Sequence, residues 1–446
     1  MIEALLLLIA FLVILLLIAV FFYWIGYRAG KAKFLISALE NGERTSDAVE
    51  FTKEPQIVVN GTGNNRNEIL DRLLVVDEYE GPVIPAANYI LYNDDDINAF
   101  RTTFEIEKRR LHVLNPLGQG YFGVVRKAIL TCANASITVA IKNVATNWDG
   151  DKPPLWEELK AIAAAGLLPN VLAFLGFTEP ERRLTIITEY CDGGDLLCYL
   201  KSRRDVFEDK LEYFAIKQNK VEEIITEKTG KYRPSGIEDD SLDSLCTFDL
   251  LSFAYQIANG MKHLKSVAIV HNDLALRNVL LNNDKTIRIG DFRSSKRIET
   301  DRYHIQSADT AIPVVHIAPE VFEDFKFSEE TDVWAFGVTL YELFTLGRKP
   351  YDQMHPHEIK TFLGNGGRLG EPEYCTREVY NFMLDCWSQD PDKRPNFSRC
   401  KQFFEQHFDQ HNLPICENVE NKLRVTTEEQ RRLRSLIQAE NHLSNF

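Results

Sequence analysis

The stretch "LGQGYFGVV", Leu117–Val125, decides the fold. Its glycines follow a G-x-G-x-x-G spacing, which also occurs in dinucleotide-binding loops. A dinucleotide-binding loop leads from a strand into a helix, whereas here strand-like runs stand on both sides, "LHVLNPL" before and "GVVRKAIL" after. Glycines let backbone amides approach phosphate oxygens without side chains between them. The stretch therefore predicts a β-hairpin that folds over phosphate groups.

Further strand-like runs surround this hairpin and precede a helical region. "ITVAIKNV", "VLAFLGFT" and "LTIITEY" read as strands, and "WEELKAIAAAG" between them reads as one helix. After Tyr190 helical periodicity takes over: one predicted helix has Thr247 as its N-cap and an apolar face made by Leu250, Ala254, Ile257, Met261 and Leu264. "DVWAFGVTLYELFTLG" is apolar nearly all round and predicts a buried central helix. The predicted fold is α+β, with a small antiparallel sheet lobe carrying one helix and a larger helical lobe.

Charged and amide side chains follow in an order that suits phosphoryl transfer. The ammonium of Lys142, in "VAIK", can neutralise phosphates if a carboxylate holds it, although a surface lysine on a strand is the commoner case. "HNDLALRN" offers Asp273 to orient and deprotonate a hydroxyl and Asn278 to hold a metal ion, and "GDF" offers Asp291 as a second metal ligand. Hard oxygen ligands of this kind suit Mg²⁺. Each motif alone is weak, but their order, with "APE" following, is specific.

With these motifs in place, residues 111–407 resemble a protein kinase catalytic domain. "DLALRN" and "IPV" are similar to the tyrosine kinase motifs D-L-A-A-R-N and L-P-V, so the resemblance implies ATP as phosphoryl donor, Mg²⁺ (or Mn²⁺) as cofactor and protein tyrosines as acceptors. The charged segment 203–244 resembles the insert of split receptor kinases of the fibroblast and platelet-derived growth factor receptor types. The overall layout is similar to nematode receptor-like tyrosine kinases with little chain outside the cell.

The resemblance also implies roles for individual residues. The implied catalytic residues are Asp273, Arg277, Lys142 and Glu158, the last chosen over Glu157. The implied nucleotide-binding residues are Leu117, Gly118, Gln119, Gly120, Gly123, Val125, Ala140, Lys142, Glu189, Cys191 and Leu280. The implied metal ligands are Asn278 and Asp291. Further implied roles are Thr188 as gatekeeper, Tyr303 as activation-loop tyrosine, Asp332 as a brace for the catalytic loop, and an ion pair between Glu320 and Arg394.

The chain departs from the family pattern at three places. Asn272 replaces the arginine of H-R-D, which removes the usual partner of a phosphorylated Tyr303, and Val315 and His316 replace the residues after L-P-V. Arg293 replaces the glycine of D-F-G; if its backbone takes positive φ, its side chain costs about 1–2 kcal/mol, which predicts a slower enzyme. Two interpretations stay open: a working tyrosine kinase, or a pseudokinase scaffold that binds nucleotide or partners with little catalysis.

The N-terminal segment predicts a membrane anchor. Ala4–Ile25 carries no charge and as a helix would span about 33 Å, enough for a bilayer of about 30 Å. A cleaved signal peptide is the alternative, but it favours a basic start and a shorter apolar run. Basic residues follow the span, so the positive-inside rule places residues 1–3 outside and the rest in the cytosol, at the cell membrane. The lipid bilayer is thus a predicted partner, and the net charge of −14 argues against nucleic acid as a partner.

Two polar segments complete the predicted organisation. Residues 26–110 read as an irregular juxtamembrane linker with Tyr79, Tyr89 and Tyr92, which together with Tyr303 are possible sites for phosphotyrosine-binding proteins; an ordinary exposed tyrosine is the alternative. Residues 408–446 form a tail in which Thr427 and Gln430 predict a capping box at the start of a solvated helix.

Overall fold

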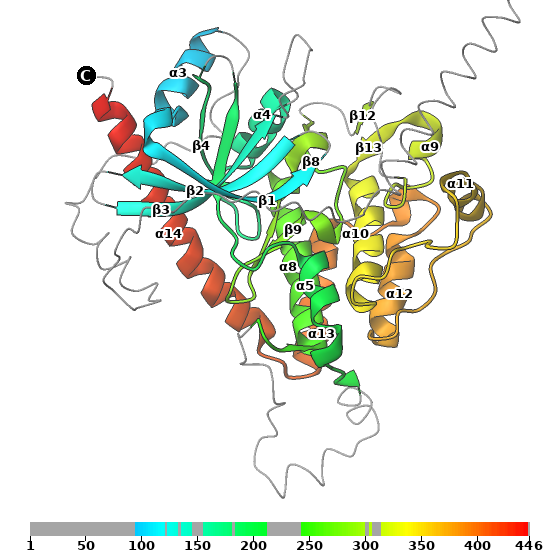
Figure 1. Ribbon diagram of the computed structural model, residues 1–446. Coiled ribbons are helices and arrows are strands. Elements are labelled where there is room, and N and C mark those ends of the chain that lie inside the picture. The colour runs from blue at the N-terminus through cyan, green and yellow to red at the C-terminus, as the bar shows by residue number, and fades with distance from the viewer. Residues whose placement is uncertain are drawn as a thin grey trace, which may run out of the picture. The chain divides into compact units, whose positions relative to one another are not determined.

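The computed structural model describes residues 94–120, 123–132, 135–144, 155–180, 183–211, 242–298, 303–305 and 314–444 (Figure 1). The predicted membrane span, and most of the predicted linker with Tyr79, Tyr89 and Tyr92, lie outside these residues. Within the described ranges, no helix combines the length and the apolar character that a bilayer crossing requires.

The small lobe is an antiparallel sheet of five strands in the order β1-β2-β3-β5-β4. The strands are β1 (Leu111–Gly120), β2 (Gly123–Cys132), β3 (Ala135–Val144), β4 (Phe174–Thr178) and β5 (Thr185–Glu189). Gly120 of β1 pairs with Gly123 of β2, so the glycine-rich stretch joins two antiparallel strands and no helix follows it. The predicted hairpin is confirmed, and the dinucleotide-binding alternative is excluded.

Two helices accompany this sheet where the sequence predicted one. α4 (Leu155–Ala165) is the predicted helix. α3 (Asp94–Phe104) lies in the stretch predicted as an irregular linker, so that prediction is wrong here. Its rings at i and i+4, Phe100 and Phe104, are buried against the rings of β4, with Phe100 stacked on Phe177 at 5.5 Å. Aromatic side chains one helical turn apart share a face, and that face supplies the burial that stabilises α3.

The large lobe is helical. Its helices are α5 (Leu196–Ser202), α8 (Thr247–Ser266), α9 (Val321–Asp324), α10 (Glu329–Phe344), α11 (Pro356–Gly364), α12 (Arg377–Cys386), α13 (Phe397–Gln410) and α14 (Ile415–Ser444). Its short strands are β6 (Phe207–Glu208), β7 (Leu245–Cys246), β8 (Ile269–Val270), β9 (Val279–Leu281), β10 (Ile287–Ile289), β11 (Lys296–Arg297), β12 (Tyr303–Ile305) and β13 (Lys326–Ser328). The predicted apolar face of α8 and the predicted central helix α10 are both buried. The predicted N-cap is off by one residue: Cys246 caps α8 and forms a capping box with Asp249.

The predicted insert begins too early in the sequence. Its first residues, Arg203–Leu211, are ordered: β6 pairs in parallel with β7, and the ring of Phe207 contacts Tyr374 at 4.7 Å. This apolar and backbone pairing ties the segment to the helical lobe. Residues 212–241 lie outside the described ranges.

The tail is not a solvated helix. α14 contacts α8 and α13 of the helical lobe and α3 and β2 of the small lobe, and Figure 1 shows it extending from beside α13 to beside the sheet and α3. Thr427 lies inside the helix and is buried with Gln430, so the predicted capping box at the helix start is also wrong. The helix begins twelve residues earlier, at Ile415, because Val419 and Leu423 there are already buried in the large lobe's core.

Candidate active site

Lys142 of β3 lies at the centre of a cluster of charged side chains between the lobes. Its Nζ donates to Oε1 of Glu158 at 2.6 Å and to Oδ1 of Asp291 at 3.1 Å. The side chain of Glu158 is 5% exposed, and this burial raises its pKa while the Lys142 ammonium opposes the rise. Glu157, its neighbour in α4, is 55% exposed and pairs with Lys160 and Lys296. The predicted choice of Glu158 thus agrees with the contacts.

The loop before β9 holds the predicted base and one predicted metal ligand together. The amide Nδ2 of Asn278 donates to the backbone oxygen of Asp273 at 2.7 Å and to its Oδ2 at 3.1 Å. Arg277, in the 3₁₀ turn Leu276–Asn278, forms an ion pair with Oδ1 of Asp273. Because Asn278 directs its amide N–H groups at Asp273, its carbonyl oxygen is the atom left to bind a cation.

Buried hydrogen bonds hold this loop in shape. Asp332 of α10 accepts from the backbone N–H of His271 at 2.7 Å and of Asn272 at 2.8 Å, as the predicted brace should. Burial raises the pKa of Asp332 to about 7, although both amide donors favour its ionised form. The ring of His271 accepts from the N–H of Asp273 at 3.3 Å and bonds the oxygen of Gly290 at 3.0 Å. Burial lowers the pKa of His271, so a neutral ring links the Asp273 loop to the segment that carries Asp291.

The first departure from the family pattern fits the local backbone. Asn272 has φ of 65°, a left-handed conformation that asparagine tolerates better than most residues. Its amide donates to the oxygen of Ser294 at 2.7 Å and contacts Nε2 of His304 at 3.3 Å. Asn272 therefore joins the catalytic loop to β12 through uncharged contacts.

His316, which belongs to the second departure, is connected to the catalytic loop through Glu342. His316 contacts Oε2 of Glu342 in α10 at 3.2 Å, and both side chains are buried. The same oxygen accepts from the N–H of Leu276 at 3.1 Å. Burial would raise the pKa of Glu342, but His316, the N–H of Leu276 and Arg277 together outweigh burial and lower that pKa. His316 thus supports the turn that carries Arg277 and Asn278, a role that sequence reasoning did not assign.

The third departure corrects the expectation about Arg293. Its backbone lies in the 3₁₀ turn Phe292–Ser294, and the positive φ of 60° belongs to Asp291. The expected steric cost of a side chain at position 293 is therefore absent. Instead the guanidinium folds back onto the predicted metal ligand: Nε donates to Oδ1 of Asp291 at 2.6 Å, and Nη2 pairs with Oδ2.

Asp291 consequently has two cationic neighbours. Burial would raise its pKa, but Lys142 and Arg293 outweigh burial and hold the pKa of this carboxyl far below its ordinary value. An ionised carboxylate and the free carbonyl oxygen of Asn278 are hard oxygen donors of the kind that Mg²⁺ prefers. The donor set fits the implied metal, with Arg293 as its competitor.

The predicted nucleotide-binding residues line up along the sheet and the linker after it. Leu117 and Gly118 are exposed near the end of β1; cross-strand pairing places Val125 opposite Lys142 and Ala140 opposite Thr188. Cys191 follows β5, and Leu280 lies in β9, where it bridges Asp195. Of Gln119 and Gly120 only the backbone is described, and Gly123 starts β2.

Glu189 turns its carboxylate away from this row. Oε1 accepts from the N–H of Ala173 at 2.7 Å and from Arg288 at 3.2 Å, and Oε2 accepts from Gln430 of α14 at 2.8 Å. Any nucleotide contact at this position thus falls to the backbone. Arg288 and Gln430 belong to no recognisable sequence motif, which is why sequence reasoning missed their contacts with Glu189.

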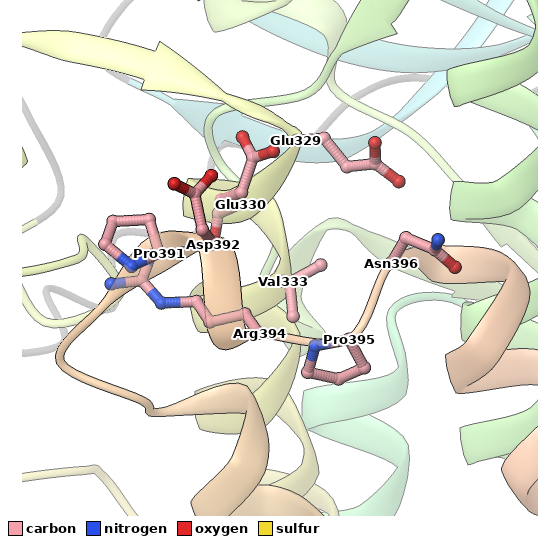
Figure 2. Close-up of a pocket in the computed structure, with 8 residues that line it drawn as sticks. All are labelled: Glu329, Glu330, Val333, Pro391, Asp392, Arg394, Pro395 and Asn396. Atoms are coloured by element: carbon pink, nitrogen blue, oxygen red, sulfur yellow. Dashed lines mark hydrogen bonds between the residues drawn. The ribbon is translucent and has the colours of Figure 1, made fainter.

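A separate hollow lies in the large lobe, and Figure 2 shows it between the start of α10 and the segment 391–396. Arg394 forms one wall, and its guanidinium makes the predicted ion pair with Glu320 at 2.7 and 2.9 Å. None of the predicted catalytic, nucleotide-binding or metal-binding residues lines this hollow. The arrangement around Lys142 remains the candidate active site.

The sequence of this chain is similar to the sequences of known proteins. Residues 111–404 match the family described as protein tyrosine and serine/threonine kinase. The chain is 38% identical to the tyrosine-protein kinase receptor ver-3 of Caenorhabditis elegans, over 80% of this chain and 30% of that protein. It is 36% identical to the receptor-like tyrosine-protein kinase kin-15 of the same organism, over 76% of this chain and 72% of that protein. It is 31% identical to the mast/stem cell growth factor receptor Kit of Canis lupus familiaris, over 78% of this chain and 39% of that protein.

The matched range includes β1–β5, most of the large lobe and the positions of Lys142, Glu158, Asp273 and Asp291. The chain spans less than half the length of ver-3 and of Kit, and nearly three quarters of kin-15. The predicted resemblance is confirmed: this chain belongs to the protein tyrosine and serine/threonine kinase family, with receptor tyrosine kinases among its relatives.

Proposed function

We propose that this chain is a membrane-anchored protein tyrosine kinase that transfers the γ-phosphoryl group of ATP to protein tyrosines. The observation that carries the proposal is the double contact of Lys142 with Glu158 and Asp291, which brings residues from the sheet, α4 and the large lobe to one point. Phosphoryl transfer depends on positioning and electrostatics, and this point supplies both.

Each side chain has a defined task in the proposed reaction. Asp273 accepts the proton of the tyrosine hydroxyl and orients its oxygen, and Arg277, paired with Asp273, fixes the direction of the carboxylate. Lys142, held by Glu158, binds the phosphates under the glycine-rich hairpin. Asn278 and Asp291 would hold Mg²⁺, which when bound neutralises charge on the phosphates.

The placement of the strands also supports the implied adenine site. Ala140 and Leu280 would enclose the base, with Thr188 at its inner end and the backbone of residues 189–191 as hydrogen-bonding edge. Leu117 and Val125 would cover the ribose and the base from the hairpin. These assignments rest on the family resemblance and on the placement of the strands.

A pseudokinase scaffold is the alternative, favoured by Arg293 and Asn272. The full-length chain, purified in detergent, should phosphorylate a Glu/Tyr copolymer with Mg-ATP, and Asp273→Asn should lower the rate at least about 10²-fold. Equal silence of both proteins, with nucleotide still bound, supports the scaffold instead.

The anchor and the docking sites are proposals of the same kind. Residues 4–25 would hold the chain in the cell membrane with the kinase domain in the cytosol. Alkaline carbonate should leave the expressed chain in the membrane fraction and release a chain lacking residues 1–33. Tyr303 is 42% exposed on β12, open to modification and to phosphotyrosine-binding proteins.

A further inference from the structure

Every carboxylate of the candidate active site already has a cationic partner from the chain itself. Glu158 pairs with Lys142 and Asp273 pairs with Arg277. The third pair joins Asp291 to Arg293, and both oxygens of Asp291 take part in it. Asp291 is therefore neutralised before any divalent cation arrives.

The guanidinium has the geometry of a competitor. It binds Asp291 through Nε and Nη2 as a fork, the arrangement in which arginine binds a carboxylate most strongly. Its side chain is nevertheless 31% exposed, so the guanidinium lies at the edge of the solvent and is not enclosed in the core. A metal ion reaching Asp291 has to displace this fork or share the carboxylate with a positive charge.

We propose that Arg293 is an internal counter-cation of Asp291 that competes with the divalent metal and thereby sets the metal requirement of nucleotide binding. The inference rests on the proposed function, because the metal it concerns is the one that accompanies ATP. Arg293 acts through Asp291, so it is a positioning residue. Its effect belongs to the affinity for the metal and appears before any chemical step.

The test measures binding and needs no turnover. A fluorescent ATP analogue with a non-hydrolysable β,γ linkage is held at fixed concentration with the full-length chain in detergent, and Mg²⁺ is titrated. Arg293→Gly removes the competitor, and Arg293→Met removes its charge while keeping most of its volume. Arg297→Met, an exposed arginine four residues further on, is the matched control for loss of one positive charge.

We expect the half-saturating Mg²⁺ concentration to fall about tenfold or more in both Arg293 variants, because a unit charge a few ångströms away weakens a divalent ion's binding by at least that factor. Arg293→Lys, which keeps the charge but loses the fork, should lie between them and the wild type. Arg297→Met should stay within about twofold of the wild type, since solvent and salt screen an exposed charge. The unfolding temperature of each variant verifies that it is folded.

The outcomes separate this inference from the proposed function. If the analogue binds but the Mg²⁺ dependence is the same with and without the Arg293 charge, the counter-cation inference is wrong and the kinase proposal stands. A higher Mg²⁺ requirement in Arg293→Gly and Arg293→Met also overturns it, because Arg293 would then assist the bound state. If no folded protein binds the analogue at any Mg²⁺ concentration, the kinase proposal fails and the inference fails with it.

Discussion

Two adjacent glutamates in α4 show how much a single position decides. Glu158 is buried and bonded to Lys142, whereas Glu157 is exposed and pairs with surface lysines. Because α4 is a helix, neighbouring residues point about 100° apart, and only one of the two reaches the lysine.

We therefore expect Glu158→Gln to lower the kinase activity on a Glu/Tyr copolymer about 10²-fold, since an oriented ammonium loses its charged partner. Glu157→Gln, the matched control, should stay within about twofold, because exposed pairs contribute little. Rate measurements on the two full-length variants decide between them. Equal losses in both would show that the Lys142 contact does not matter for transfer.

At this scale the sequence identifies the groups but not their partners. Motif spacing predicted which aspartates, lysine and asparagine would meet, because the fold fixes the backbone positions of these motifs. Side-chain direction escaped prediction. The side chain of Arg293 folds onto Asp291, two residues earlier in the sequence, and the carboxylate of Glu189 is held by Arg288 and Gln430; no motif encodes either contact.

Among the elements, the pair β12–β13 links the activation loop to the large lobe. His304 of β12 stacks on Phe327 of β13 at 5.5 Å, and its Nε2 faces the amide of Asn272. Burial, with Lys296 adding to it, lowers the pKa of His304 to about 4. An asparagine N–H can donate to a neutral ring nitrogen, whereas a protonated ring would present a donor to a donor.

The sign of the pH effect follows from this lowered pKa. When β12 separates from β13, His304 has the ordinary histidine pKa of about 6.5 and binds a proton more readily than it does in the paired strands. The pairing of β12 with β13 is thus fully stable above about pH 6.5 and loses stability as the pH falls toward 4.

We expect the backbone amides of β12 and β13 to exchange hydrogen faster, relative to the buried amides of α10, as the pH drops through this window. His304→Phe retains the ring on Phe327 and cannot titrate, so its exchange ratio should stay flat. If the wild type and His304→Phe show the same pH profile, the titrating group lies elsewhere.

The burial of α14 was not predicted for a physical reason that lies in this one helix. The buried positions of α14 recur every three or four residues, as an inward face requires: Val419, Leu423, Thr427, Gln430, Arg434, Ile437 and Asn441. In the second half most of these are polar, so the periodicity does not appear in hydropathy. Their partners are distant: Arg434 bonds the oxygen of Phe174, and Asn441 bonds that of Thr103.

We expect Ile437→Ala to lower the free energy of unfolding by about 2–4 kcal/mol, because the side chain is fully buried in the small lobe's core. The side chain of Arg432 is 52% exposed, so Arg432→Ala should change the free energy of unfolding by less than about 0.5 kcal/mol. Urea unfolding followed by tryptophan fluorescence measures both. A solvated tail, as first expected, would give two equally small changes.

Over the whole molecule, α14 contacts both lobes on either side of the connection between them. Toward the large lobe, Lys422 bonds the oxygen of Asp284 and Glu420 accepts from Tyr255. Toward the small lobe, Gln430 bonds Glu189 and Ile437 is buried. The two-lobed architecture was predictable because strand and helix periodicities separate along the chain. This second link was not, because it joins segments hundreds of residues apart through polar side chains.

A helix anchored to both lobes should restrict their relative motion. We expect a chain ending at Asn412, which lacks α14, to exchange backbone amide hydrogens faster in residues 189–194 and in β4 than the full chain does, since both lose their contacts to Gln430 and Arg434. The buried amides of α10 serve as the internal reference for global unfolding. A chain ending at Asn441 keeps these contacts and is the matched control.

Faster exchange in the short chain, with α10 still protected, assigns α14 the role of a second connection between the lobes. Unchanged exchange in residues 189–194 would mean that the single linker after β5 already fixes the lobes.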